Sequence, residues 1–171
     1  NPSIQAGGGS IAGYTVYGIS FNPPYSYTDP HSTPIMVGQD DVWGSVVELP
    51  FGFCYFENIY NQAVVGANGI ISFNPSVAGN YCNWNLTSQP DIPGGLPFKN
   101  AIYGVYEDIH PGLVSQSDVS QRYAGIYEGI LGQFPCRTLT VSYYNIPLYS
   151  CTTQRNTYQI VLYEGSNVID V

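Results

Sequence analysis

The stretch from Asn100 to Val171 constrains the fold most strongly, because nearly all of it is typical of β-strands. From Thr138 to Tyr143, threonine and serine alternate with leucine, valine and tyrosine, which is the period of a strand with one buried and one solvent-exposed face. The segment from Tyr158 to Tyr163 carries large apolar side chains on both faces. A turn at Glu164–Asn167 then leads into a further strand that begins at Val168. We therefore expect antiparallel hairpins here and no long helix.

Shorter strand signals alternate with turns in the rest of the chain. An apolar segment at Val42–Leu49 continues as Phe51–Phe56 after a proline, and further strands are expected at 101–109 and 125–131. Asn68-Gly69 is a preferred type I′ pair with apolar residues on both sides, which predicts a tight hairpin. Short strands separated by glycine and proline turns predict an all-β fold, an antiparallel β-sandwich of jelly-roll-like type with long loops.

The domain organisation is expected to be simple. Residues 1–12, with Gly7-Gly8-Gly9-Ser10, are typical of a flexible leader, and residues 13–171 are expected to form a single β-sandwich domain. Because the last expected strand stops at Val171 without a turn, we expect more of the parent protein to follow it.

The charge balance excludes several classes of partner. Lysine and arginine number 4 against 12 aspartates and glutamates, which gives a net charge of −8. A surface with so few cations lacks the basic stripe that neutralises phosphates, so nucleic-acid binding is disfavoured, and anionic membranes would repel it. The sequence also lacks an apolar run of the roughly 20 residues that a membrane-spanning helix needs.

The four cysteines predict two disulfides. Cys54, Cys82, Cys136 and Cys151 are spaced too widely for a zinc or redox CxxC motif. Of the three possible connectivities we favour Cys54 with Cys82, which bracket a hairpin, and Cys136 with Cys151, which bracket a single strand-and-return unit. Disulfides would place the protein in an oxidising compartment. Four buried free thiols are the alternative.

Acidic residues offer candidate chemistry but no clear catalytic pattern. Glu107-Asp108 is the most enzyme-like pair, yet neighbouring strand residues point to opposite faces, so the two carboxylates are not expected to converge as a glycosidase requires. The same geometry opposes a metal site built with His110. Calcium ligands are conceivable at Asp29, Asp40 and Asp41, although the spacing of a DxDxDG loop is absent. We expect no catalytic residue, no enzymatic activity, and calcium as the only candidate cofactor.

Aromatic residues are the better binding candidates. Most of the 16 tyrosines are expected to pack in a sandwich core or on its strands. Aromatic residues in loops at the ends of a sandwich are more often placed for recognition. The loop residues that we single out on this basis are Tyr25, Tyr27, Tyr81 and Trp84.

Four sequence blocks carry a resemblance to known families. In chain order they are VVGANGIISFN, NAIYGVYEDI, PCRTLTVSYYNIP and TYQIVLYEGSNVIDV, within Phe51–Val171. They resemble an N-terminal-region domain of large surface proteins of gliding Bacteroidetes, adhesins that are exported by type IX secretion. More distantly, the chain is similar to the nidogen-type (NIDO) extracellular domain. The matching positions are structural, namely turn, core and disulfide residues: Asn68, Gly69, Phe73, Cys136 and Cys151.

The resemblance implies attachment and not turnover. It implies an extracellular, cell-surface location after export across the outer membrane, and it carries no catalytic residue onto this chain. We expect a noncatalytic adhesion domain that binds a surface glycan or another surface protein. A carbohydrate-binding module of a secreted polysaccharide-degrading protein is the alternative.

Overall fold

The computed structural model describes residues 18, 33–35, 38–85, 98–115, 117–118, 121 and 123–171. Almost all regular structure in these residues is β-strand, which confirms the all-β prediction. The strands are β1 (Thr33–Pro34), β2 (Trp43–Tyr55), β3 (Asn58–Gly66), β4 (Ile70–Ser72), β5 (Ala101–Tyr103), β6 (Gly125–Leu131), β7 (Thr138–Pro147), β8 (Arg155–Tyr163) and β9 (Ile169–Asp170), and the 3-10 helices are η1 (Pro75–Val77) and η2 (Pro111–Leu113). The described residues include no helix with the length and apolarity needed to cross a membrane.

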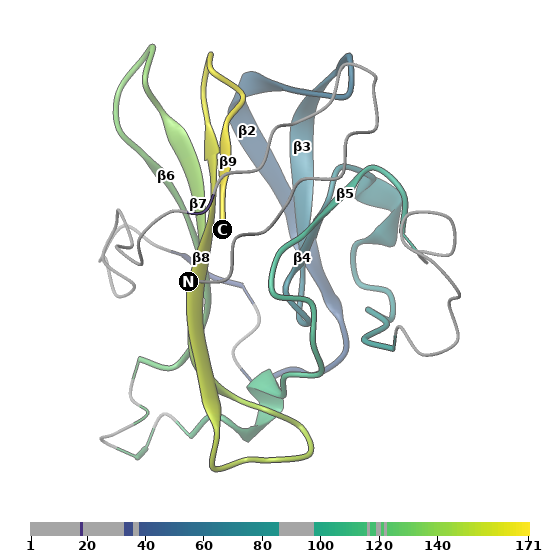
Figure 1. Ribbon diagram of the computed structural model, residues 1–171, viewed down its shortest axis with the longest axis vertical. Coiled ribbons are helices and arrows are strands. Elements are labelled where there is room, and N and C mark those ends of the chain that lie inside the picture. The colour runs from purple at the N-terminus through teal and green to yellow at the C-terminus, as the bar shows by residue number, and fades with distance from the viewer. Residues whose placement is uncertain are drawn as a thin grey trace.

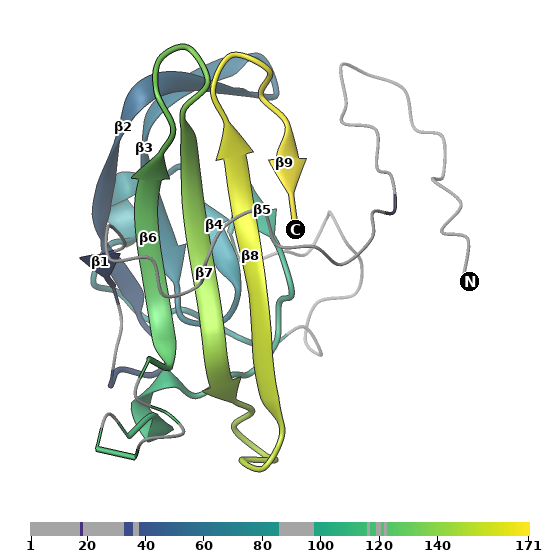
Figure 2. The same cartoon turned by 90° about the vertical axis from the view of Figure 1, so that its left-hand side faces the viewer.

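The strands form two antiparallel sheets that face each other (Figure 1). One has the order β1-β6-β7-β8-β9 and the other the order β2-β3-β4-β5. Figure 2 shows β6, β7 and β8 side by side, with the short β9 at the edge next to β8. From β2 to β5 and from β6 to β9, successive strands are neighbours in one sheet. The jelly-roll expectation was therefore wrong, because a jelly roll is built from Greek keys and not from simple meanders.

One hydrophobic core lies between the two sheets. Side chains of β2, β3 and β4 pack against those of β6, β7 and β8 in a single buried cluster. Tyr143 of β7 lies fully inside this cluster, and its hydroxyl donates a 2.8 Å hydrogen bond to the carbonyl of Gly66 on β3. The bond ties the two sheets together where no water competes for either group.

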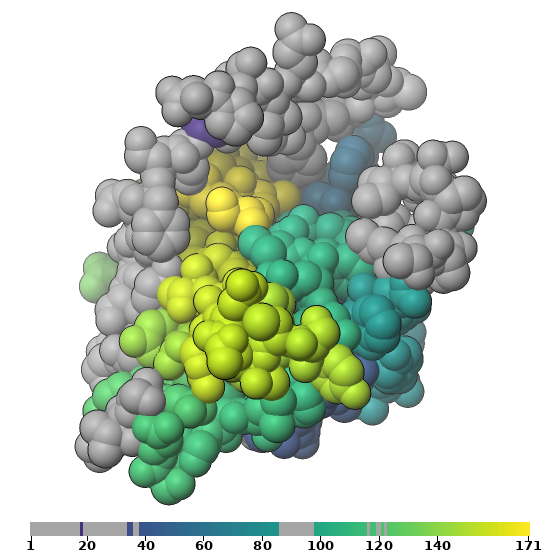
Figure 3. Space-filling view, turned by 60° about the horizontal axis from the view of Figure 1, so that its bottom comes forward, coloured from purple at the N-terminus to yellow at the C-terminus, as the bar shows by residue number. Residues whose placement is uncertain are grey.

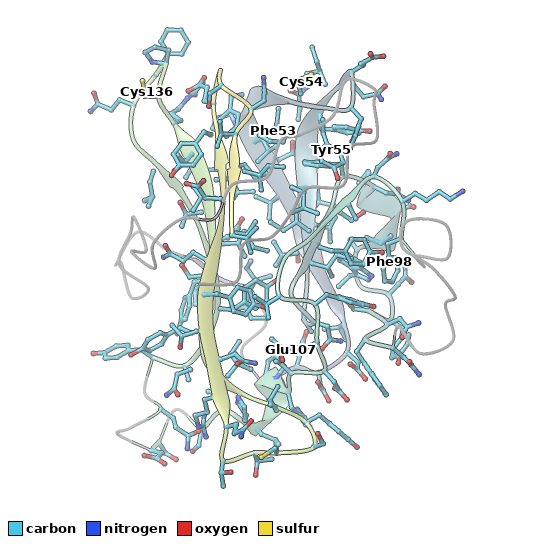
Figure 4. The ribbon with its side chains drawn as sticks, in the orientation of Figure 1. Phe53, Cys54, Tyr55, Phe98, Glu107 and Cys136 are labelled. Atoms are coloured by element: carbon cyan, nitrogen blue, oxygen red, sulfur yellow. The ribbon has the colours of Figure 1, made fainter. Side chains whose placement is uncertain are left out.

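Part of the smaller sheet is also covered on its other face, while Glu48 and Pro50 of β2 stay exposed there. Trp43, Val64, Ile70 and Cys82 form a second buried cluster there, and Phe98, labelled in Figure 4, packs edge-on against Trp43 with ring centroids 4.9 Å apart. Around Trp43, Val64 and Ile70 the sheet is buried on both faces, which holds this part of it rigidly. The segments that continue from its strands therefore start from fixed positions.

The alternating pattern of β7 was interpreted correctly on one face only. Leu139, Val141 and Tyr143 lie in the core as predicted. The threonine and serine side chains of the other face are also buried and not exposed to solvent. Their hydroxyls are satisfied locally: Thr138 Oγ1 lies 3.2 Å from Thr140 Oγ1, and the Ser142 hydroxyl accepts a 2.9 Å bond from Gln159. Periodicity shows which residues share a face, but not whether that face is covered.

The predicted hairpin at Asn68-Gly69 is present, but its turn differs from the predicted one. β3 and β4 pair through Gly66 and Ile70, so three residues form the connection. Gly69 has a positive φ of 77° and Asn68 does not, whereas a type I′ turn needs positive φ at both central residues. Asn68 is fully buried, and its side chain has a structural role that is described below.

The two predicted disulfides are contradicted, because no disulfide joins any two of the four cysteines. Cys54 lies near the end of β2 and Cys82 next to its start, so the 13-residue strand separates them by about 30 Å. Cys136 and Cys151 lie beyond opposite ends of β7, which separates them by a similar distance. Disulfides need Cα atoms within about 7 Å. In Figure 4, Cys136 and Cys54 lie at the same end of the molecule, on different sheets.

Candidate functional site

Chain segments far apart in sequence meet at one end of the sandwich, the lower end in Figure 1. A bridge between Val42 and Tyr81 joins the residues before β2 to the segment after η1, and a bridge between Ile109 and Leu148 joins the segment after β5 to the β7–β8 turn. Figure 3 looks onto this end, where the yellow-green β7–β8 turn lies beside the green segment after β5. We call this end of the sandwich the acidic end. The residues that define it are Asp40, Asp41, Glu107, Asp108 and His110.

Asn68 fixes the segments of the acidic end to one another. Its amide Nδ2 donates to Asp41 Oδ1 at 2.8 Å and to the Cys82 carbonyl at 3.0 Å. Its Oδ1 accepts the backbone N–H of Ile109 at 3.2 Å. One buried side chain on the β3–β4 turn therefore positions residues from three other segments. The sequence marked Asn68 as a turn residue and gave no sign of this role.

His110 connects the acidic end to an aromatic ring. Its Nε2 lies 3.3 Å from Asp40 Oδ2, and its ring stacks on Tyr149 with centroids 5.5 Å apart and an interplanar angle of 16°. The backbone supports this arrangement, because the Tyr149 N–H donates to the Asp108 carbonyl at 2.9 Å and the His110 N–H donates to the Pro147 carbonyl at 2.8 Å. The β7–β8 turn thus holds Tyr149 against the His110 ring.

The carboxylates of the acidic end disfavour one another's ionisation. Burial raises the pKa of Asp108, and the nearby charges of Asp41 and Asp40 raise it further. Burial also raises the pKa of Asp40, where His110 acts in the opposite direction. Asp40 Oδ1 and Asp108 Oδ1 are buried and accept no hydrogen bond from the described residues. The local field at this end is therefore negative, and it favours a partner that brings positive charge or hydrogen-bond donors.

Glu107 and Asp108 do not act on a common point. The Glu107 carboxylate accepts a hydrogen bond from Asn156 on β8, whereas Asp108 interacts electrostatically with Asp40 and Asp41. This agrees with the expectation that adjacent carboxylates diverge, and it differs from the facing pair that a glycosidase uses. Figure 4 labels Glu107 at this end of the molecule.

The predicted calcium site at Asp29, Asp40 and Asp41 stays a prediction. Asp29 lies outside the described residues, while Asp40 and Asp41 direct oxygens to different partners, His110 and Asn68. Among the residues that the structure describes, no three His, Cys, Asp or Glu side chains are grouped so that they could hold a metal ion.

The predicted aromatic ligand residues divide into two sets. Tyr25 and Tyr27 lie outside the described residues. Tyr81 is 61% exposed, and after local burial the charges of Asp41 and Asp108 contribute to the raised pKa of its hydroxyl. Trp84 follows three residues later and is 36% exposed.

Sequence reasoning missed Tyr149, which is 56% exposed while its ring stacks on His110. Its position directly after a long predicted strand was the available signal, because that strand leads the chain to an end of the sandwich. Two exposed phenol rings thus lie at this end, Tyr81 near the carboxylates and Tyr149 on His110.

The comparison with known families gives one match. A family model described as NIDO related matches residues 16–171, which is most of the chain. No curated protein and no solved structure matches the sequence.

Proposed function

The chain belongs to the NIDO-related family, whose domains are extracellular, and from this premise we propose that it is a noncatalytic binding domain of a large bacterial surface protein. Its partner is another surface protein, bound through the acidic end. The observation that carries the proposal is that exposed Tyr81 lies near the carboxylates and exposed Tyr149 stacks on His110, whose Nε2 lies 3.3 Å from Asp40.

Exposed tyrosines next to charged groups suit an interface. Aromatic residues contribute much of the binding energy at protein interfaces, and a phenol ring loses little conformational entropy when it is covered. The carboxylates add specificity, because a surface rich in lysine or arginine would pair with Asp40, Asp41 and Asp108 and relieve their mutual repulsion. Such pairing accelerates association most at low ionic strength.

The resemblance of the four sequence blocks to gliding-motility adhesins is what supports the finer proposal that the parent protein is a surface adhesin of the type IX-secreted class. Attachment does not require the carboxylates to converge on a substrate. The divergence of Glu107 and Asp108 is compatible with that role.

A bead-retention assay tests the proposed function. Beads that display the domain are allowed to settle on a layer of gliding Bacteroidetes cells and are then exposed to increasing shear flow. We expect the wild-type domain to retain beads and the double variant Tyr81→Ala/Tyr149→Ala to lose most of this retention. Raising the salt concentration should weaken wild-type retention as well.

The matched control is Phe134→Ala. Phe134 is 77% exposed in the turn between β6 and β7, at the end opposite Tyr81 and Tyr149, so its removal should leave retention unchanged. Equal retention by the wild type and the double variant would show that the acidic end is not the contact surface.

A further inference from the structure

A second candidate site lies on β2 and β3, away from the acidic end. A groove of about 390 Å³ is lined there by both polar and apolar side chains, and we call it the β3 groove. Its volume lies within the range of small-molecule sites. The residues that matter for its chemistry are Glu48, Tyr60, Asn61, Gln62 and Phe73.

The polar side of the groove is built by a cross-strand pair. Glu48 and Gln62 are direct partners in the β2–β3 register, and Gln62 Nε2 donates to Glu48 Oε1 at 2.6 Å. This bond fixes the planes of both groups. It uses one amide N–H and one carboxylate oxygen, so the amide oxygen, the second N–H and the second carboxylate oxygen can bond a ligand. Asn61, an exposed neighbour, adds another amide.

The apolar side of the groove is the ring of Tyr60, which packs on buried aromatic rings of the core. Tyr60 stacks on Phe73 with centroids 4.6 Å apart and an angle of 18° between the planes, and Phe73 stacks in turn on Phe53 at 5.7 Å. Phe53 and Phe73 are buried, while Tyr60 is half-buried. The core therefore holds the Tyr60 ring in one orientation. Ile59, at 70% exposure, extends the apolar surface beside it.

We propose that the β3 groove binds a neutral oligosaccharide. A sugar ring has an apolar C–H face and a rim of hydroxyls that each donate and accept hydrogen bonds. A fixed aromatic ring beside planar amide and carboxylate groups is complementary to both features. The ligand is neutral because Glu48 and the net charge of −8 repel sulfated or uronate-rich chains. This site does not depend on the acidic end.

Titration with defined oligosaccharides, followed by the NMR signals of the protein, tests the proposal. The probes are the hexaoses of β-1,4-glucan, β-1,3-glucan, xylan and mannan, each to millimolar concentration, together with oligoalginate as the anionic comparison. We expect at least one neutral hexaose to bind and oligoalginate to bind more weakly. Gln62→Ala and Asn61→Ala should each raise the dissociation constant of that hexaose at least tenfold.

The matched control is Gln133→Ala, which removes an exposed glutamine from the β6–β7 turn and should leave the dissociation constant unchanged. Melting temperatures of all variants identify any that fail to fold, and Asn61→Ala alters only an exposed side chain. The proposal is overturned if no neutral hexaose binds, if oligoalginate binds more tightly than every neutral probe, or if folded Asn61→Ala and Gln62→Ala bind like the wild type. None of these results alters the bead-retention test, which reports on Tyr81 and Tyr149.

Discussion

Replacing Asn68 with alanine should destabilise the protein. The substitution removes three hydrogen bonds, to Asp41, to the carbonyl of Cys82 and from the N–H of Ile109. The Ile109 N–H keeps a partner, because it also donates to the Glu107 carbonyl at 3.0 Å. The carbonyl of Cys82, a fully buried residue, loses the amide that it accepts from.

The expected loss in the free energy of unfolding follows from these contacts. The bonds to Asp41 and to the Cys82 carbonyl contribute about 1 kcal/mol each. Leaving the Cys82 carbonyl unsatisfied costs roughly another 1 kcal/mol, so the total is about 3 kcal/mol. For a chain of this size the melting temperature should fall by about 10 °C. Urea denaturation followed by tryptophan fluorescence measures the free energy directly.

The control for this experiment is Asn58→Ala. Asn58 is exposed in the β2–β3 hairpin, and its side chain makes one local bond, from Nδ2 to the carbonyl of Phe56 at 2.9 Å. Its removal should cost less than about 1 kcal/mol. If Asn68→Ala were no more destabilising than Asn58→Ala, then Asn68 would not hold the acidic end together and the account of that end would be wrong.

Three further predictions concern the core, the acidic end and the cysteines. Tyr143→Phe, which removes the buried hydroxyl bond to Gly66, should cost about 1 to 2 kcal/mol in the same urea assay; no loss would mean that this bond does not stabilise the sheet pair. Because the folded pKa of Asp108 is raised above 3.8, its ionisation destabilises the fold as pH rises through that pKa. Asp108→Asn should therefore stabilise the protein at neutral pH, by less than about 1 kcal/mol because solvent screens a partly exposed carboxylate. This gain should disappear below the unfolded pKa, and a gain that persists in acid would contradict the electrostatic explanation. Alkylation of the unfolded, unreduced chain should add a label to each of the four cysteines by intact mass, whereas two disulfides would block all labelling.

Strands were predictable where the signal is local. β6 has the bounds that the sequence indicated, and the β8–β9 hairpin turns where the Glu164–Asn167 segment was expected to turn. Alternation along a strand reflects the two faces of a sheet, so it survives without knowledge of the partners. It could not show that the hydroxyl-bearing face of β7 is buried, because covering a face depends on segments elsewhere in the chain.

The disulfide pairs and the role of Asn68 could not be predicted because both depend on contacts between residues far apart in the sequence. The favoured cysteine pairs bracket strand units in sequence, but a strand carries its two ends apart, so such residues are separated by its full length. Asn68 was recognised as a turn residue and not as a buried side chain with three partners. A local motif specifies backbone preference, while the partners of a side chain depend on the tertiary fold.

The acidic end was predictable only in pieces. Asp40-Asp41 and Glu107-Asp108 were both noted, but as separate candidates for separate chemistries. Their meeting depends on the bridge between Ile109 and Leu148 and on Asn68, and neither is visible in the spacing of the acids. Tyr149 was missed for the same reason, since its contact with His110 joins two loops that are far apart in the sequence.

Hydrogen–deuterium exchange of the domain while it is attached to gliding cells tests the central claim most directly, because it maps the covered surface without assuming which residues bind. Binding through the acidic end predicts slower exchange in residues 81–85, 104–110 and 149–153 than in the free domain. Slowing confined to the turns at 132–137 and 164–168, at the other end of the sandwich, would contradict that claim.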